Sequence, residues 1–376
     1  MLDQKELREY SEMANGFPLV FDGHNDTVMQ LARGDRSFFE KSETGHIDLP
    51  RCREGGLIGG FFAVYIIDPG VADVLQNARD EGRDPTEALG EYAQQYADPA
   101  NWPDPMPLDY AQTNALNMLG TLFKVEKESE GQVKIVRTAA ELEQCIADGT
   151  FAIELHFEGA EPLDTDGDAL EVFYAAGLRS VGLTHSRRNI FTEGVPFAFP
   201  ASPDTGPGLN DLGKELVRQL NRKKIMIDLS HITEQGFWDV SAMTDAPLVA
   251  THSNAWNLSN SPRNLTDKQM DAIKESNGVA GLNFHVGFLR DDGANDADTP
   301  ISAMVDHIQY MVDKMGIDCV ALGSDYDGAT MPAELKDAAG LPKLMQALSG
   351  AGFSNDDLTK IAHGNWVRVL RETWGE

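Results

Sequence analysis

The sequence predicts an α/β protein built as a (β/α)8 TIM barrel, and three observations lead to this prediction. Eight short runs of apolar and β-branched residues follow one another, amphipathic helical patterns separate them, and a chain of 376 residues suits one barrel with insertions. Several of the runs are almost continuously apolar, which is typical of parallel strands that are buried on both faces. The predicted strands are Pro18–Gly23, Leu57–Ile67, Phe151–Phe157, Leu178–Leu183, Lys224–Leu229, Pro247–Ala250, Gly278–Phe284 and Ile317–Gly323.

A doubly wound open sheet is the alternative architecture. It is disfavoured because no glycine-rich phosphate loop of the dinucleotide or P-loop kind follows a predicted strand.

Helical patterns fill the segments between the predicted strands. A capping box at Thr138-Ala-Ala-Glu141 predicts the start of one helix and Gly149 its end. Apolar residues spaced by three and four predict helices within Leu209–Lys223 and Leu265–Ser276. The longest segment, residues 68–150, has mostly helical patterns, including Thr86–Ala97. We interpret it as a helical insertion after the second strand of a single domain that spans residues 1–376.

The charge of the chain excludes several classes of function. Sixty acidic and 31 basic side chains give a formal net charge of −29, which repels phosphate backbones and anionic lipid headgroups. We therefore expect no nucleic-acid partner and no membrane partner. The three cysteines form no C-x-x-C pair, the N-terminus has no apolar signal-peptide core, and no apolar run is long enough to span a bilayer. These features predict a soluble, cytoplasmic protein without a disulfide framework.

Ionisable side chains follow seven of the predicted strands. Because the carboxyl ends of barrel strands meet at one end of the barrel, we expect these groups to form one cluster. They are His24 and Asp26 after strand one, Glu158 after strand three, His185, His231, His252 and His285 after strands four to seven, and Asp325 after strand eight.

A divalent metal centre explains this cluster. Taken singly, each of these residues is more often a cap or a hydrogen-bonded core residue than a metal ligand. Gathering so many ionisable groups in one crevice is costly unless metal ions hold them together. Imidazole and carboxylate groups are common zinc ligands, and Glu158 can bridge two ions through its two oxygens. Together with His24, Asp26, His231 and His252, it would give each of two metals three protein contacts.

Six motifs resemble, in order, those of the membrane (renal) dipeptidase family of binuclear zinc peptidases, in the amidohydrolase superfamily. The motifs are FDGHNDT (Phe21–Thr27), FEGAE (Phe157–Glu161), LTHSRRN (Leu183–Asn189), IDLSH (Ile227–His231), THSNAWNLSNSPRNLTD (Thr251–Asp267) and GSDYDG (Gly323–Gly328). The resemblance implies a (β/α)8 barrel with two Zn²⁺ ions. It also implies hydrolysis of dipeptides, both L-Xaa-L-Xaa and L-Xaa-D-Xaa, by a hydroxide that bridges the metals.

The resemblance further implies roles for individual residues. His24, Asp26 and Glu158 would bind one zinc, while Glu158, His231 and His252 would bind the other. The substrate-binding histidine of the family stands at His185, the arginine that holds the substrate carboxylate at Arg263, and the proton-transferring aspartate at Asp325. The neighbouring Asp327 is expected to support the loop.

Several features leave alternatives open. His156 and His285 stand where relatives usually carry apolar or aromatic residues, so the sequence does not define their roles. The Pro- and Gly-rich loop Ile190–Pro207 is expected to influence specificity. Hydrolysis of N-acyl amino acids or lactams is the alternative enzymatic function, and a non-catalytic barrel would lack metal ligands. A homodimer is a further possibility. Membrane attachment, known for mammalian relatives, is not expected.

Overall fold

Eight parallel strands form a nearly closed barrel in the computed structural model, which describes residues 16–83 and 98–375. Around the barrel they are β1 (Val20–Asn25), β2 (Leu57–Tyr65), β4 (Phe151–Glu158), β5 (Leu178–Gly182), β6 (Met226–Asp228), β7 (Val249–Ala250), β8 (Val279–Leu282) and β9 (Val320–Leu322). A parallel bridge between Asn25 and Tyr326 joins the last strand region to the first. The predicted (β/α)8 barrel is therefore confirmed.

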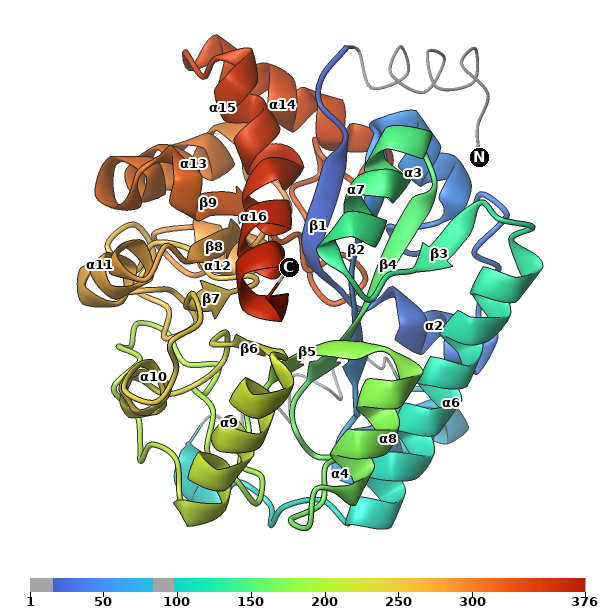
Figure 1. Ribbon diagram of the computed structural model, residues 1–376, viewed down its shortest axis with the longest axis vertical. Coiled ribbons are helices and arrows are strands. Elements are labelled where there is room, and N and C mark those ends of the chain that lie inside the picture. Colours follow the sequence, from blue (N-terminus) through green and yellow to red (C-terminus); the bar gives the residue numbers. More distant parts are fainter. Residues whose placement is uncertain (1–15, 84–97, 376) are drawn as a thin grey trace.

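Helices surround the strands, as Figure 1 shows. In chain order they are α2 (Thr27–Arg33), α3 (Leu49–Gly55), α4 (Pro69–Glu81), η1 (Pro99–Asn101), α6 (Leu108–Glu128), α7 (Ala139–Asp148), α8 (Asp168–Ala176), α9 (Asp211–Lys223), α10 (Glu234–Ser241), α11 (Asp267–Glu275), α12 (Val286–Leu289), α13 (Ile301–Met315), η2 (Ile317–Cys319), η3 (Ala338–Gly340), α14 (Leu341–Gly350), α15 (Asn355–Thr359), η4 (Lys360–Gly364) and α16 (Asn365–Trp374).

The predicted helix boundaries agree closely with the structure. Helix α7 begins after Thr138, whose side chain accepts a hydrogen bond from the Glu141 amide, and it ends at Gly149 in the left-handed conformation. The second hydrogen bond at this end of the helix differs from that of a standard capping box. The Glu141 carboxylate accepts it from the backbone amide of Arg137, one residue before the N-cap. Helix α11 has a complete capping box between Thr266 and Gln269.

The segment between β2 and β4 contains one strand that the sequence analysis missed. Residues Val133–Ile135 form β3, which pairs in parallel with β4 outside the main barrel order. Three residues are too few to produce a recognisable alternation of apolar and polar side chains. The described helices of this segment are α4, η1, α6 and α7, whereas most of the predicted helical stretch Thr86–Ala97 lies in residues 84–97, outside the described part.

Several strand predictions were too long, and two examples show why. Ile317–Cys319 forms a 3-10 turn ahead of β9, and the strand β7 contains only Val249 and Ala250. Both errors lie at element ends, where an apolar run continues beyond the hydrogen-bonded part of the strand.

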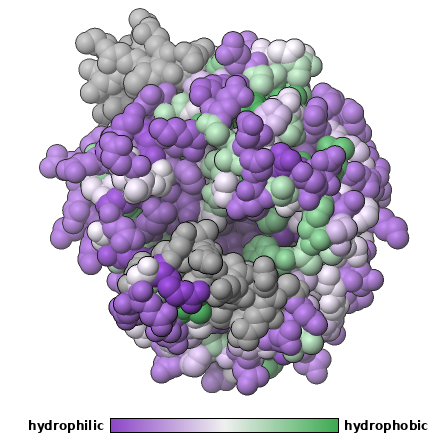
Figure 2. Space-filling model, turned by 180° about the vertical axis from the view of Figure 1, so that it is seen from behind, coloured by the Kyte–Doolittle hydropathy of each residue, from purple (hydrophilic) through white to green (hydrophobic). Residues whose placement is uncertain are grey.

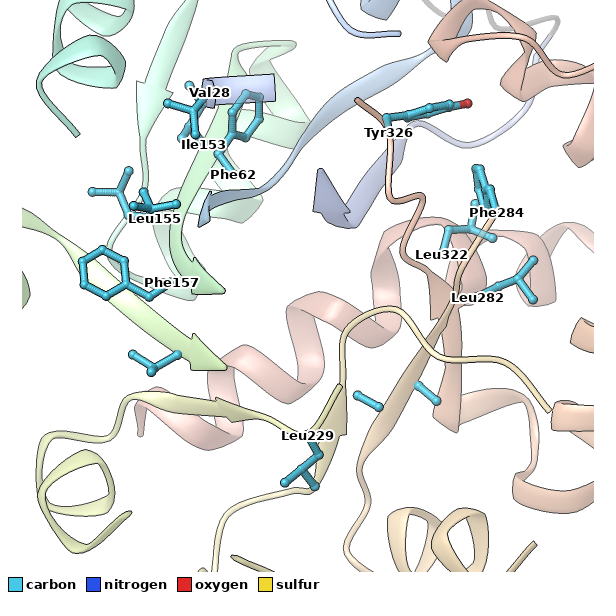
Figure 3. Packing of buried hydrophobic residues seen from close by; sticks show 14 of the residues in the cluster. Val28, Phe62, Ile153, Leu155, Phe157, Leu229, Leu282, Phe284, Leu322 and Tyr326 are labelled. Carbon is cyan, nitrogen blue, oxygen red and sulfur yellow. The ribbon is translucent and has the colours of Figure 1, made fainter. Parts of the chain in front are cut away.

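Two apolar layers hold the barrel together. The larger layer lies between strands and helices, and Figure 3 shows Phe62 of β2 and Ile153 of β4 beside Val28 of α2. The smaller layer fills the amino-terminal half of the barrel interior with residues such as Phe61 and Ala152. Alternate residues of β4 therefore face outward or inward, and the inward set continues upward as Glu154, His156 and Glu158.

Helix α16 closes the barrel at the amino-terminal ends of the strands. The Trp366 ring is fully buried in the inner layer, and its indole nitrogen donates to the Leu322 carbonyl at 3.0 Å. A side chain on Gly23 would collide with this ring and with the carbonyl of Thr251. Glycine is thus required between Asp22 and His24 because three segments meet there.

The opposite face of the molecule is open. Seen from behind the view of Figure 1, this face is hollowed near its centre, and hydrophilic residues form the base of the hollow (Figure 2). The strands thus end beneath an accessible depression, which is where barrel enzymes carry their active sites.

Candidate metal centre

Glu158, at the carboxyl end of β4, is the centre of the polar cluster. The His231 Nε2 atom lies 3.0 Å from its Oε1 atom, and the Nε2 atoms of His24 and His252 each lie 3.5 Å from the same oxygen. The His231 and His252 Nε2 atoms are 3.1 Å apart. Three imidazoles from β1 and from the segments after β6 and β7 therefore point their nitrogen atoms at one carboxylate.

Asp26 and Asp325 complete the cluster on the side of His24. The His24 Nε2 atom lies 3.7 Å from Asp26 Oδ2. Ligand atoms of His24, Asp26 and Asp325 all lie within 4.8 Å of one another, as do those of His24, Glu158 and His252 and those of Glu158, His185 and His231. The predicted ligands are thus brought together, with His185 and Asp325 beside them.

Burial and charge oppose each other in this cluster. Burial alone would lower the pKa of His24, but the carboxylates of Glu158, Asp26 and Asp325 outweigh it and raise the pKa to about 10. Burial raises the pKa of Glu158 to about 8, against the effect of His24. The carboxylates thus create a strong demand for positive charge, which a proton on His24 meets in part.

Several buried atoms of the cluster lack hydrogen bonds. Neither ring nitrogen of His24, nor Asp26 Oδ1, has a hydrogen-bond partner among the residues that the structure describes. Buried polar atoms are nearly always satisfied, so unpaired ones need an explanation. Nitrogen and carboxylate lone pairs that converge in this way fit divalent metal ions.

A relay of hydrogen bonds fixes the tautomer of His252. The Asp228 carboxylate can only accept, so the Thr251 hydroxyl, 2.7 Å from Asp228 Oδ2, donates its proton there. The same hydroxyl lies 2.7 Å from His252 Nδ1 and must therefore accept from that nitrogen. His252 Nδ1 carries the proton, and its Nε2 atom keeps a free lone pair for a metal.

His231 and His185 lie side by side next to this centre. The Ser186 hydroxyl lies 2.9 Å from His231 Nδ1, which leaves Nε2 directed at Glu158. The His185 ring lies 4.2 Å from that of His231 and 4.5 Å from that of Tyr65, measured between centroids. Burial lowers the pKa of both histidines well below 6.5, helped by the charges of Arg187 and Arg263 at His185 and of Arg263 at His231, so both imidazoles are neutral.

Asp325 is held by a side chain that the sequence analysis did not single out. The Asn283 amide, at the end of β8, donates to Asp325 Oδ2 at 2.9 Å, and the Asn283 Oδ1 atom accepts from the His285 amide. A side chain on Gly328 would collide with Asp26 Oδ2 and would lie 2.6 Å from Asp325 Oδ1. One oxygen of Asp325 is therefore anchored and the other faces Asp26.

Asp327, two residues further, has different surroundings. Its Oδ2 atom accepts from the Thr27 hydroxyl at 2.8 Å and pairs with the Arg36 guanidinium, while its Oδ1 atom accepts from the His46 amide at 2.6 Å. This carboxylate connects the loop after β9 to α2 and to the loop before α3.

Arg263 lies behind the cavity wall. Its side chain is buried, one terminal nitrogen donates to the His252 carbonyl at 3.2 Å, and its Nε atom has no hydrogen-bond partner among the described residues. The guanidinium carbon lies 5.5 Å from the centre of the Phe288 ring. Burial lowers the pKa of Arg263 to about 10, against the effect of Asp325 and Glu158.

A cavity of about 290 Å³ opens onto the cluster. Besides Asp26, Glu158, His185, His231 and Asp325, its lining comprises Met29, Tyr65, Phe197, His285, Phe288, Asp327, Gly328 and Ala329. The cavity lining thus combines the ionisable cluster with several aromatic and apolar side chains.

His156 belongs to a separate buried group below the cluster. The Ser180 hydroxyl donates to Glu154 Oε2 at 2.9 Å and lies 2.8 Å from His156 Nδ1. Burial lowers the pKa of His156 to about 3, so this imidazole is neutral at neutral pH, and burial raises the pKa of Glu154 well above 4.5.

A convergent set of imidazoles and carboxylates at the mouth of a (β/α)8 barrel defines a metal-dependent hydrolase. A family model of the membrane dipeptidases (peptidase family M19) matches residues 7–374. The chain belongs to this family of metallopeptidases.

Individual relatives agree with this assignment. A crystal structure of a Rhodobacter sphaeroides metallopeptidase, liganded with a phosphinate mimic of the dipeptide L-Ala-D-Ala, is 43% identical, covers 95% of this chain and 100% of its own, and has a TM-score of 0.87. An uncharacterised protein from the pqqA 5′ region of Klebsiella pneumoniae is 47% identical over 68% of this chain and 94% of its own length. The dipeptidase tcpJ of Claviceps purpurea is 27% identical over 93% of this chain and 76% of its own length.

None of the described helices combines the length and the apolar character that crossing a membrane requires.

Proposed function

We propose that this chain hydrolyses dipeptides at two divalent metal ions, which we expect to be Zn²⁺. The observation that carries the proposal is the convergence of the Nε2 atoms of His24, His231 and His252 on one oxygen of Glu158. On this proposal His24, Asp26 and Glu158 hold one ion, and Glu158, His231 and His252 hold the other. The unpaired atoms of His24 and Asp26 support it.

The metals would supply the Lewis acidity of the reaction, making a water molecule acidic enough to attack and polarising the scissile carbonyl. The chain would supply the remaining groups. His185 is neutral and lines the cavity, so it can donate a hydrogen bond to the carbonyl oxygen as negative charge develops there.

Asp325 would move the proton. Its Oδ2 atom is fixed by Asn283, so its Oδ1 atom is free to accept a proton from the attacking water and to pass it to the leaving amine. This role requires an acceptor at the cavity surface, and Asp325 lines the cavity.

Arg263 would hold the carboxylate of the dipeptide. A planar guanidinium suits a carboxylate, and Arg263 forms no ion pair with any acid of the described chain. Because it lies behind the wall formed by Phe288, we expect the carboxylate to reach its Nε atom beside that ring. A longer peptide would place a neutral amide where the Arg263 guanidinium favours a carboxylate, so we expect dipeptides to be preferred.

Comparing dipeptides with N-acetylated amino acids tests the proposal. We expect L-Xaa-L-Xaa and L-Xaa-D-Xaa dipeptides to be cleaved, and metal analysis to give about two ions per chain. Turnover of N-acetyl amino acids or lactams without turnover of any dipeptide would favour the alternative amidohydrolase function.

The organisation of the chain is part of the proposal. We treat residues 1–376 as one hydrolase domain, with residues 68–150 as an insertion after the second barrel strand. We also retain the homodimer as a prediction that the mass of the protein in solution would test.

A further inference from the structure

We propose that Phe197 and Phe288 form a subsite for an aromatic side chain on the C-terminal residue of the dipeptide. This inference rests on the proposed function and adds a class of preferred substrate to it.

Phe197 exposes more than half of its surface at the cavity. It lines the cavity, yet 55% of the residue is exposed. Its ring lies 5.7 Å from that of His185 and 6.4 Å from that of His231, between centroids. A large exposed apolar group directly above a polar cluster gains from being covered, and a ligand in the cavity would cover it.

Phe288 faces Phe197 from the other side of the barrel mouth. The two ring planes are parallel to within 6°, and their centroids are 6.5 Å apart. Phe288 comes from α12, after β8, whereas Phe197 comes from the loop after β5. Two strand-end loops thus contribute a pair of parallel aromatic faces, onto which a third ring can stack.

The loop that carries Phe197 is fixed on both sides of this residue. The Val195 amide donates to the His231 carbonyl at 2.7 Å, and the Ala201 amide donates to the Asn260 carbonyl at 2.8 Å. The Trp256 indole donates to the Ala201 carbonyl at 2.8 Å. The position of Phe197 is therefore set by the barrel, and its exposure does not come from a loose loop.

The position of Arg263 assigns the subsite to the C-terminal residue. Its guanidinium lies against the Phe288 ring, so a substrate carboxylate held by Arg263 places the adjacent α-carbon next to Phe288. On this proposal the side chain on that carbon contacts the paired rings. The amino-terminal residue extends to the other side of the scissile bond.

Hydrolysis of a small dipeptide panel by the full-length zinc-loaded protein tests this subsite. The substrates are Ala-Phe, Phe-Ala and Ala-Ala, each as L,L and L,D isomers. We expect kcat/KM for Ala-Phe to exceed that for Ala-Ala by about tenfold, and Phe-Ala to show no such gain. Phe197→Ala and Phe288→Ala should each reduce the ratio of kcat/KM for Ala-Phe to that for Ala-Ala from about ten to about one.

Two further variants separate the subsite from a loss of folding. Phe197→Tyr keeps the ring and should keep the preference for Ala-Phe. Leu116→Ala replaces an exposed apolar residue of α6 and should leave kcat/KM unchanged for both Ala-Phe and Ala-Ala. Equal losses for Ala-Phe and Ala-Ala in the alanine variants would overturn the subsite. So would a wild-type preference for Phe-Ala. Failure of the wild-type protein to cleave any dipeptide would instead overturn the proposed function.

Discussion

Two layers of the barrel interior carry the same residue types, but the pKa values of their histidines are shifted in opposite directions. In the upper layer Glu158 faces His24, whose pKa is raised to about 10. In the lower layer Glu154 and His156 are linked through Ser180, and the pKa of His156 is lowered to about 3. Both layers are buried, and β4 contributes the glutamate of each.

The number of carboxylates explains the difference. His24 is faced by Glu158, Asp26 and Asp325, whose combined charge exceeds the effect of burial. His156 is faced mainly by Asp228, 3.6 Å away, and burial dominates its pKa. Burial alone thus produces a neutral polar group, whereas a site for cations requires several acids in contact.

Replacing the central carboxylate should have the largest effect. We expect Glu158→Gln to reduce metal content below two ions per chain and activity to background, because all three imidazole contacts converge on this side chain. Metal analysis and dipeptide hydrolysis measure both. The matched variant Glu154→Gln in the lower layer should keep the metal content of the wild type. Full metal content in Glu158→Gln would contradict the assignment of the upper layer.

Asp325→Asn should lower kcat by about 10² to 10⁴-fold and leave the metal content unchanged, since it removes a proton acceptor and keeps the shape. Steady-state kinetics and metal analysis on the same preparation check this. In Asp327→Asn, the loss should fall mainly on thermal stability, because Thr27, Arg36 and His46 use that carboxylate. Equal losses of kcat in the two variants would contradict the separate roles, proton transfer for Asp325 and loop support for Asp327.

Thr251→Val should weaken metal affinity by about 10- to 100-fold, because it breaks the relay that keeps the proton on His252 Nδ1. Competition with a chelator measures this affinity without reference to activity. Thr251→Ser keeps the hydroxyl and should bind metals like the wild type. A valine variant with unchanged affinity would mean that His252 keeps its tautomer by another route.

We expect the lower layer to affect only the stability of the protein, and this effect to depend on pH. Since burial raises the pKa of Glu154, the stabilisation from its neutral form is complete below pH 4.5 and decreases as the pH rises toward the folded-state pKa. The loss amounts to at most about 1.4 kcal/mol per pH unit.

Glutamine at this position cannot ionise, so Glu154→Gln should lose less stability between pH 5 and pH 8 than the wild type. Urea unfolding of the metal-free protein at several pH values tests this difference. The exposed variant Glu334→Gln should follow the wild type, and parallel curves for all three proteins would refute the prediction.

The sequence predicted the barrel and the convergence of the polar cluster because both depend on order along the chain. Glu158, His231 and His252 each follow an apolar strand, and parallel strands bring such positions to one end. The partners of these residues could not be predicted in the same way. Asn283 and Thr251 are ordinary polar residues near strand ends, and only the packed structure shows that one holds Asp325 and the other orients His252.

The burial of Arg263 was also outside the reach of sequence. Beside Pro262 it resembles a surface arginine, and the structure instead places it against Phe288, behind the cavity wall. Its neighbours come from the segments after β7 and β8, which no local pattern relates to one another.

The contact between Gly23 and Trp366 has a consequence for the timing of folding. The indole ring that seals the base of the barrel lies against the glycine immediately before His24, so segments near opposite ends of the chain must meet before β1 is fixed. During synthesis the ribosome releases α16 long after β1, and contacts between such distant segments form slowly. We therefore expect the nascent protein to bind metal only after translation of α16, so that premature termination would yield a chain unable to retain it.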